Sequence, residues 1–203
     1  MRNVAAAAAA TTTALANLEE EIVQRSINRG VDLNDRGRFD EAELVWREAT
    51  AAGGSPRLEA RANFNLGVLF YKRSRFDEAE ATYNNAIAAN PRYANADAHN
   101  NLGVLLKDQN RIDEAEAAYK NAIAANPRYE KAQYNLGVLL NDQNRIDEAE
   151  AAYNNAIAVN PRFSDANYNL GNLLNGQNRI DEAKAAFNNA IAVNPRHEKA
   201  HFN

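Results

Sequence analysis

The fold can be read from residues 135 to 163, NLGVLLNDQNRIDEAEAAYNNAIAVNPRF. Its apolar residues have helical spacing in two separate runs, first Leu136, Leu139 and Leu140, then Ile146, Ala149, Tyr153, Ala156 and Ile157. Residues 142–145 supply a turn between the runs, and Asn160-Pro161 ends the second, because proline disfavours helical geometry in the residue before it. The stretch therefore predicts two paired amphipathic helices, and Gly137 lets them approach closely.

The same pattern recurs along the chain with a period of 34 residues. NLGVLL starts at Asn101 and Asn135, NLGNLL starts at Asn169, and RIDEAEAAY starts at Arg111 and Arg145. One helix pair of this size cannot bury both of its faces, so neighbouring pairs must stack and share a core. The sequence predicts an all-α repeat protein.

These residues resemble the signature of the tetratricopeptide repeat (TPR) family, carried by Leu136-Gly137, Ala149, Tyr153, Ala156 and Pro161. The resemblance implies a right-handed superhelical solenoid of stacked antiparallel helical hairpins. It also implies recognition of other proteins through a concave groove, without catalysis.

We expect the following organisation along the chain: an Ala/Thr-rich tail at 1–16, a divergent first repeat at 17–59, full repeats at 60–93, 96–129, 130–163 and 164–197, and the truncated start of a further repeat at 198–203. The tail has three interpretations. Ala14-Leu15-Ala16 resembles a signal-peptidase site, the composition is also that of an organellar transit peptide, and a helical or frayed end fits equally.

Composition excludes several function classes. The formal charge of -4 gives no basic footprint for nucleic acid. Cysteine is absent and the three histidines lack ligand spacing, so we expect no metal and no cofactor. No apolar run of about 18 residues exists, which predicts a soluble or peripheral protein. Its compartment stays open between the cytoplasm and an organelle interior. Carboxylate pairs such as Asp147-Glu148 recur at the start of the second helix of each repeat. Negative charge at this end complements the helix dipole, so we interpret the pairs as structural.

One polar series precedes the Leu-Gly of each repeat or its equivalent: Asn28, Asn65, Asn101, Asn135, Asn169 and Asn203. It resembles the asparagine ladder of the O-GlcNAc transferase repeat region. An asparagine offers one acceptor and two donors, which match the backbone of an extended peptide. The alternative is that asparagine serves helix packing here. The predicted groove comprises Asn65, Asn101, Asn135, Asn169, Tyr134, Val138, Tyr168 and Asn172.

Two further surfaces are predicted. Arg61, Lys72 and Arg73 form a basic patch in the first full repeat, for which a solvated face is the alternative. At the C-terminal end, Ala183, Phe187, Ala190 and Ile191 form an apolar strip whose next neighbour is cut off, and we expect a partner or further chain to cover it.

The leading hypothesis is a non-enzymatic interaction scaffold or assembly factor that binds a protein or an extended peptide. Two alternatives stay open: the targeting region of a larger enzyme such as a glycosyltransferase, and a permanent structural subunit of a large complex, for instance an organellar one.

Overall fold

The computed structural model describes residues 2–90 and 96–194, and within these ranges the chain forms ten helices and no strand. The predicted all-α class is confirmed. The chain divides into two compact units, residues 1–98 and 99–203.

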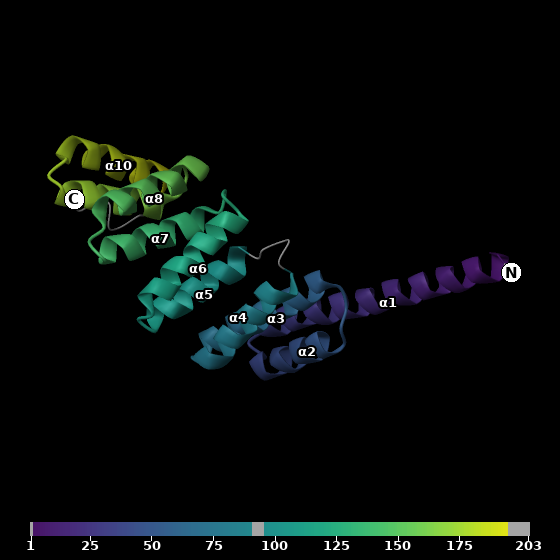
Figure 1. Cartoon of the computed structure of the whole chain (residues 1–203). Coiled ribbons are helices and arrows are strands. Elements are labelled where there is room, and N and C mark those ends of the chain that lie inside the picture. The colour runs from purple at the N-terminus through teal and green to yellow at the C-terminus, as the bar shows by residue number, and fades with distance from the viewer. Residues whose placement is uncertain (1, 91–95, 195–203) are drawn as a thin grey trace. The chain divides into compact units, whose positions relative to one another are not determined.

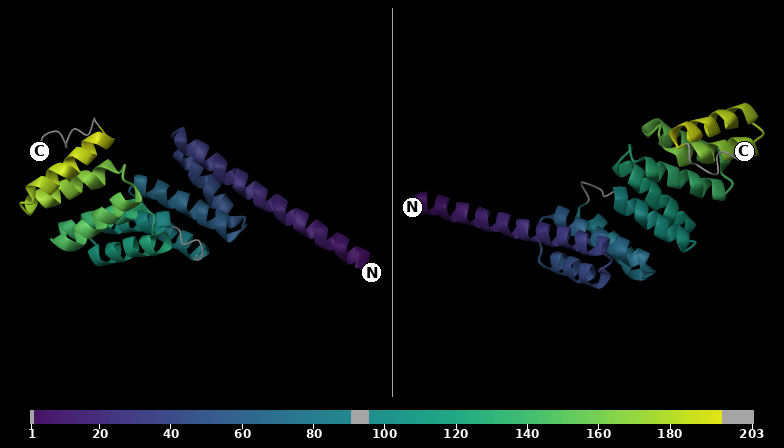
Figure 2. Two further views of the ribbon diagram at one scale, coloured as in Figure 1. Left: turned by 90° about the horizontal axis from the view of Figure 1, so that it is seen from above. Right: turned by 180° about the vertical axis from the view of Figure 1, so that it is seen from behind.

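Unit 1 consists of two helical hairpins, α1 (Arg2–Asp35) with α2 (Phe39–Ala51) and α3 (Pro56–Lys72) with α4 (Phe76–Ala89). The hairpins stack because α3 packs against both α1 and α2. Helix α1 runs without a break from residue 2 to residue 35, so the Ala/Thr-rich segment continues directly into the first repeat. Its N-terminal part extends beyond α2 and α3 (Figures 1 and 2).

Unit 2 holds α5 (Ala96–Asp108), whose first turn precedes the boundary, α6 (Ile112–Ala125), α7 (Glu130–Asp142), α8 (Ile146–Val159), α9 (Ser164–Gly176) and α10 (Ile180–Val193). Helix α7 pairs with α8 and α9 pairs with α10, while α6 packs on α7 and α8 packs on α9 (Figure 1). Among the described helices, none combines the length and the apolarity that crossing a bilayer requires.

Each hairpin turns through one residue in the left-handed backbone region: Gly37, Ser74, Asn110, Asn144 and Asn178, with φ of 74°, 56°, 60°, 59° and 62°. Glycine and asparagine tolerate this region best, and it is the usual end of a helix. The next residue then closes the turn by a backbone bond to the preceding helix, as when Arg145 N–H donates to the carbonyl of Leu140 at 2.9 Å. The predicted turn at 142–145 is therefore observed.

A glycine in the first helix lies directly under an aromatic ring of the second helix in all five hairpins. The pairs are Gly30–Trp46, Gly67–Tyr83, Gly103–Tyr119, Gly137–Tyr153 and Gly171–Phe187. A Cβ atom at Gly137 would lie 2.7 Å from Cδ1 of Tyr153, and one at Gly171 would lie 2.6 Å from Cε1 of Phe187. Both rings are almost fully buried, so the glycine sets how closely the two helices of a hairpin approach.

We predict that G137A lowers the free energy of unfolding by about 1 to 3 kcal/mol, because the added methyl group must displace a buried ring. G176A is the matched control, since nothing lies within 4 Å of a Cβ at this last residue of α9. It should be neutral or stabilising by up to about 1 kcal/mol. Chemical denaturation of both variants measures the difference, and equal stabilities would contradict the close-approach account.

Candidate functional site

The asparagines of unit 2 lie on three successive first helices, Asn101 on α5, Asn135 on α7 and Asn169 on α9. All three are half-buried. We call this surface the asparagine face; it consists of Asn101, Tyr134, Asn135, Val138, Tyr168, Asn169 and Asn172, of which only Asn172 is fully exposed. The concave groove expected for these residues stays a prediction.

Hydrogen bonds join this face from one hairpin to the next. The Nδ2 of Asn135 donates to Oδ1 of Asn100 at 2.9 Å, and the Nδ2 of Asn169 donates to the hydroxyl of Tyr134 at 3.0 Å. Asn100 in turn donates to Oδ1 of Asn101 at 3.2 Å. Asn135 and Asn169 therefore serve helix packing, the alternative that the sequence left open, and a ligand here would meet amides that already have partners.

Asn100 is the residue of this network that sequence reasoning missed. A signal was present, because the same position holds Phe64, Tyr134 and Tyr168 in the other repeats of this form. The substitution of a ring by an amide is what provides an acceptor for Asn135.

Buried rings hold the two tyrosines of the face in place. The Tyr134 ring lies 5.0 Å from that of Phe163 and 6.1 Å from that of Tyr153, and the Tyr168 ring lies 5.8 Å from that of Phe187, all tilted. Such geometry is favourable for aromatic pairs. Burial, with the nearby charge of Asp165, raises the pKa of Tyr134, so its phenol stays neutral and able to hydrogen-bond.

Asn65 lies in unit 1, on α3, and its Nδ2 is buried with no hydrogen-bond acceptor in the described chain. A buried donor without an acceptor costs about 1 to 3 kcal/mol. Asn65 thus differs from Asn135 and Asn169, whose amide groups are satisfied within their own unit.

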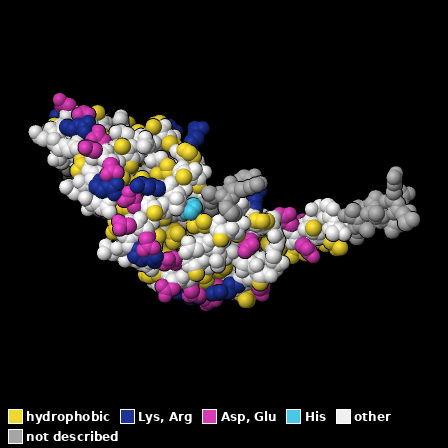
Figure 3. Space-filling view, in the orientation of Figure 1, with side chains coloured by type: hydrophobic (Ala, Val, Ile, Leu, Met, Phe, Trp, Pro, Cys, Tyr) yellow, Lys and Arg dark blue, Asp and Glu magenta, His cyan; other side chains and the backbone are white. Residues whose placement is uncertain are grey.

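The predicted basic patch is not brought together. Lys72 is the last residue of α3, and Arg61 lies eleven residues before it, about 16 Å away along the helix. The Nη2 of Arg61 donates to Oδ1 of Asn28 at 3.1 Å, and Arg73 forms an ion pair with Asp40 of α2. On the face shown in Figure 3, acidic and basic side chains lie interspersed.

The predicted C-terminal strip is not open, which corrects the sequence analysis. Ala183, Phe187 and Ala190 are 2%, 6% and 0% exposed, and Ile191 is half-buried. Phe187 is covered because its ring packs over Gly171 and beside Tyr168 within its own hairpin. The truncated repeat at 198–203 lies outside the described residues.

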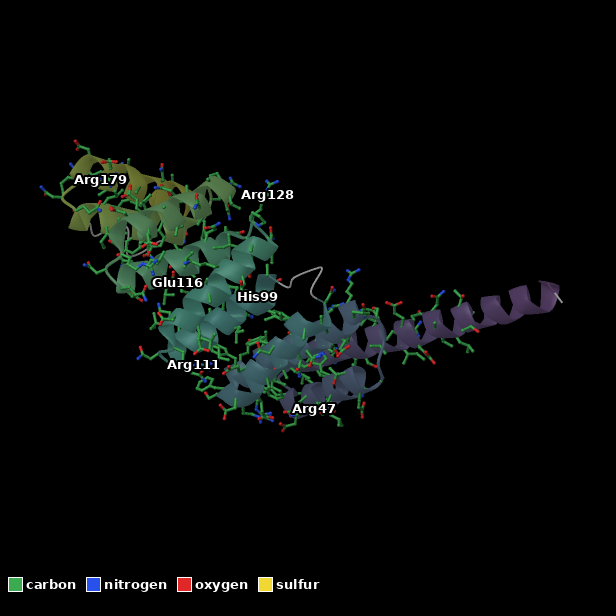
Figure 4. All side chains as sticks on the ribbon, viewed as in Figure 1. Arg47, His99, Arg111, Glu116, Arg128 and Arg179 are labelled. Atoms are coloured by element: carbon green, nitrogen blue, oxygen red, sulfur yellow. The ribbon has the colours of Figure 1, made fainter. Side chains whose placement is uncertain are left out.

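At three hairpin turns an arginine binds two carboxylates, and these arginines are Arg75, Arg145 and Arg179. Arg145 holds Glu148 through Nε and Nη2 at 2.7 and 2.6 Å, and its Nη1 reaches Glu116 of the preceding second helix at 2.6 Å. Arg179, labelled in Figure 4, does the same with Glu182 and Glu150. These bonds tie α6 to α8 and α8 to α10.

The glutamate of each of these two pairs therefore has a structural role. Hydrogen bonding to Arg145 lowers the pKa of Glu148, and Arg179 does the same for Glu182. A general acid or base needs a pKa near the working pH, and these shifts move away from it. Within the described ranges, no group of three His, Cys, Asp or Glu residues is placed to hold a metal ion.

A family model described as tetratricopeptide repeat matches residues 27–94, 69–106 and 100–166, which together span more than half of the chain. A second model with the same description matches residues 140–201. Among curated proteins, none matches the sequence.

Several solved structures share the fold. YrrB, described as a TPR protein with an unusual peptide-binding site, is 22% identical with a TM-score of 0.66, covering 94% of this chain and 95% of its own. PilF of Pseudomonas aeruginosa is 21% identical with a TM-score of 0.78, covering 90% and 81%. MamA is 24% identical with a TM-score of 0.70, covering 84% and 96%.

We predict that E116Q makes the stability of the fold less dependent on pH in the acid range. Hydrogen bonds from Arg145 and then Lys120 lower the pKa of Glu116 from 4.5, so its contribution to stability is present above that value and is lost as the pH falls through the folded-state pKa. Thermal unfolding between about pH 7 and about pH 3 should show wild type losing more stability than E116Q.

K120M removes only the second of these bonds, so it should change the profile in the same direction by less. Profiles of wild type and E116Q that run parallel down to the acid limit would show that this carboxylate does not link the helices.

Proposed function

The chain belongs to the tetratricopeptide repeat family, and we propose that it is a non-catalytic scaffold that binds an extended segment of a partner protein on the asparagine face. The observation that carries the proposal is the row of half-buried amides and rings on α5, α7 and α9. Repeats of this kind present one such surface per hairpin, so successive hairpins offer regularly spaced contacts.

The chemistry of the face fits a peptide backbone. Asparagine side chains can accept from backbone N–H groups and donate to carbonyls without reading the partner's side chains. Tyr134 and Tyr168 add rigid apolar area with a polar tip, which is typical of residues that contribute strongly to protein interfaces. A structural neighbour described as having an unusual peptide-binding site supports the same class of partner.

The internal hydrogen bonds separate two roles within the face. Asn135 and Asn169 already join hairpins, whereas Asn172 is exposed and makes no side-chain hydrogen bond within the described chain. Asn65 has a buried Nδ2 without an acceptor. We therefore assign recognition first to Asn172, together with the half-buried rings of Tyr134 and Tyr168, although the Tyr134 hydroxyl itself belongs to the joint with Asn169.

We predict that N172A weakens the affinity for the partner by about 2- to 13-fold, the equivalent of one lost hydrogen bond of about 0.5 to 1.5 kcal/mol. The midpoint of thermal unfolding should not change. The partner is recovered from the source cells by affinity capture and titrated against purified variants. N188A, the same change at an exposed asparagine of α10, is the control and should bind like wild type.

N135A should instead lower stability, because it removes the bond to Asn100. If wild type, N172A and a folded Y168A variant bind the partner with equal affinity, the partner does not bind on the asparagine face.

A further inference from the structure

A second surface of unit 2 is hollowed into a cleft of about 340 Å³ between α8, α9 and α10. Six of its lining residues carry the argument: Glu150, Asn154, Asn167, Leu170, Glu182 and Asn189. Asn167 lies two residues before Asn169 on α9, about 200° around the helix. The cleft therefore faces away from the asparagine face.

A buried amide lines the cleft. Asn167 is only 2% exposed, and its Nδ2 donates to the carbonyl of Phe163 at 3.1 Å. Its Oδ1 accepts no hydrogen bond from the described residues. Because Asn167 lines the cleft, a donor that enters the cleft can reach this acceptor. The cleft thus suits a ligand that brings an N–H group.

The charge around Glu150 indicates the kind of donor when α8 is compared with two other second helices, α2 and α6. In α4 the equivalent Glu80 is followed by an asparagine, Asn84, as Glu150 is by Asn154. Glu43 is bound by Arg47 and Arg75, and Glu116 is bound by Lys120 and Arg145. In both, one of the two cations lies four residues further along the same helix.

Glu150 is the equivalent residue of α8, and four residues further along stands Asn154 in place of a cation. Within the described chain, Glu150 is bound only by Arg179, through Oε2 at 2.6 Å. The same guanidinium also holds both oxygens of Glu182. Two carboxylates beside the cleft therefore share one positive charge, and Asn154, which replaces the second, lines the cleft.

We propose that this cleft binds an arginine side chain of a partner segment. The planar guanidinium has donors for both Oε1 of Glu150 and Oδ1 of Asn167, and its aliphatic stem can lie against Leu170. This site is separate from the asparagine face and does not depend on the proposed function.

The test uses the full chain, labelled with ¹⁵N, and the probe acetyl-Ala-Arg-Ala-amide. The matched probe carries citrulline, which has the same shape without the charge. The side-chain amide signals of Asn154 and Asn167 should shift with the arginine probe, with a dissociation constant on the order of 1 mM for one exposed ion pair and a few hydrogen bonds. The citrulline probe should bind at least about fivefold more weakly.

Two variants fix the site. N154K places a second cation beside Glu150, as Lys120 does for Glu116. It should weaken the affinity for the arginine probe at least about tenfold. E150Q removes the carboxylate charge and should act in the same direction. Thermal unfolding checks that both variants remain folded.

The proposal is overturned if the arginine probe shifts neither amide, if both probes bind equally, or if the folded N154K and E150Q variants bind like wild type. Because the probe replaces the natural partner, a negative result here leaves the asparagine face to be judged by its own variants.

Discussion

A glycine of the first helix lies directly under an aromatic ring of the second helix, and this contact sets how the two helices of a hairpin pack. It occurs in every hairpin, from Gly30 and Trp46 to Gly171 and Phe187. The ring fills the space that a side chain would otherwise need, which fixes the distance between the helices. A left-handed residue then closes the turn, so a short motif defines a complete unit.

Hairpins of this geometry are joined on two sides, and the two kinds of joint determine which residues remain for partners. Along the second helices, arginines of the turns reach back to a carboxylate of the preceding hairpin, as Arg145 does to Glu116. Along the first helices, amides do the same, as Asn135 does to Asn100. Asn172 takes part in neither joint, so its whole side chain remains available to another molecule.

The helix pairs, their turns and the role of Gly137 could be predicted from the sequence, because each depends on spacing that repeats every 34 residues. Features that depend on side-chain direction could not. The bond from Asn169 to Tyr134 joins residues 35 positions apart, and the ion pair of Arg73 with Asp40 joins two that no periodicity relates.

The burial of Phe187 was mispredicted for a similar reason. The spacing of apolar residues in the second helix shows that Phe187 lies on its apolar side. It does not show that the Phe187 ring is already covered by packing over Gly171 in the same hairpin. The cleft at Asn167 escaped notice because Asn154, which stands where α6 has Lys120, gains its meaning only from the neighbouring carboxylate of Glu150.

Hydroxyl-radical footprinting of the chain alone and in its captured complex measures whether the partner binds on the asparagine face. Tyr134 and Tyr168 are half-buried on the face, the deeply buried Tyr153 is an internal reference, and Tyr71 reports on unit 1. If the partner binds on the face, oxidation of Tyr134 and Tyr168 is slower in the complex, while oxidation of Tyr153 is unchanged. Unaltered oxidation of Tyr134 and Tyr168, with protection at Tyr71 instead, would show that the partner binds elsewhere.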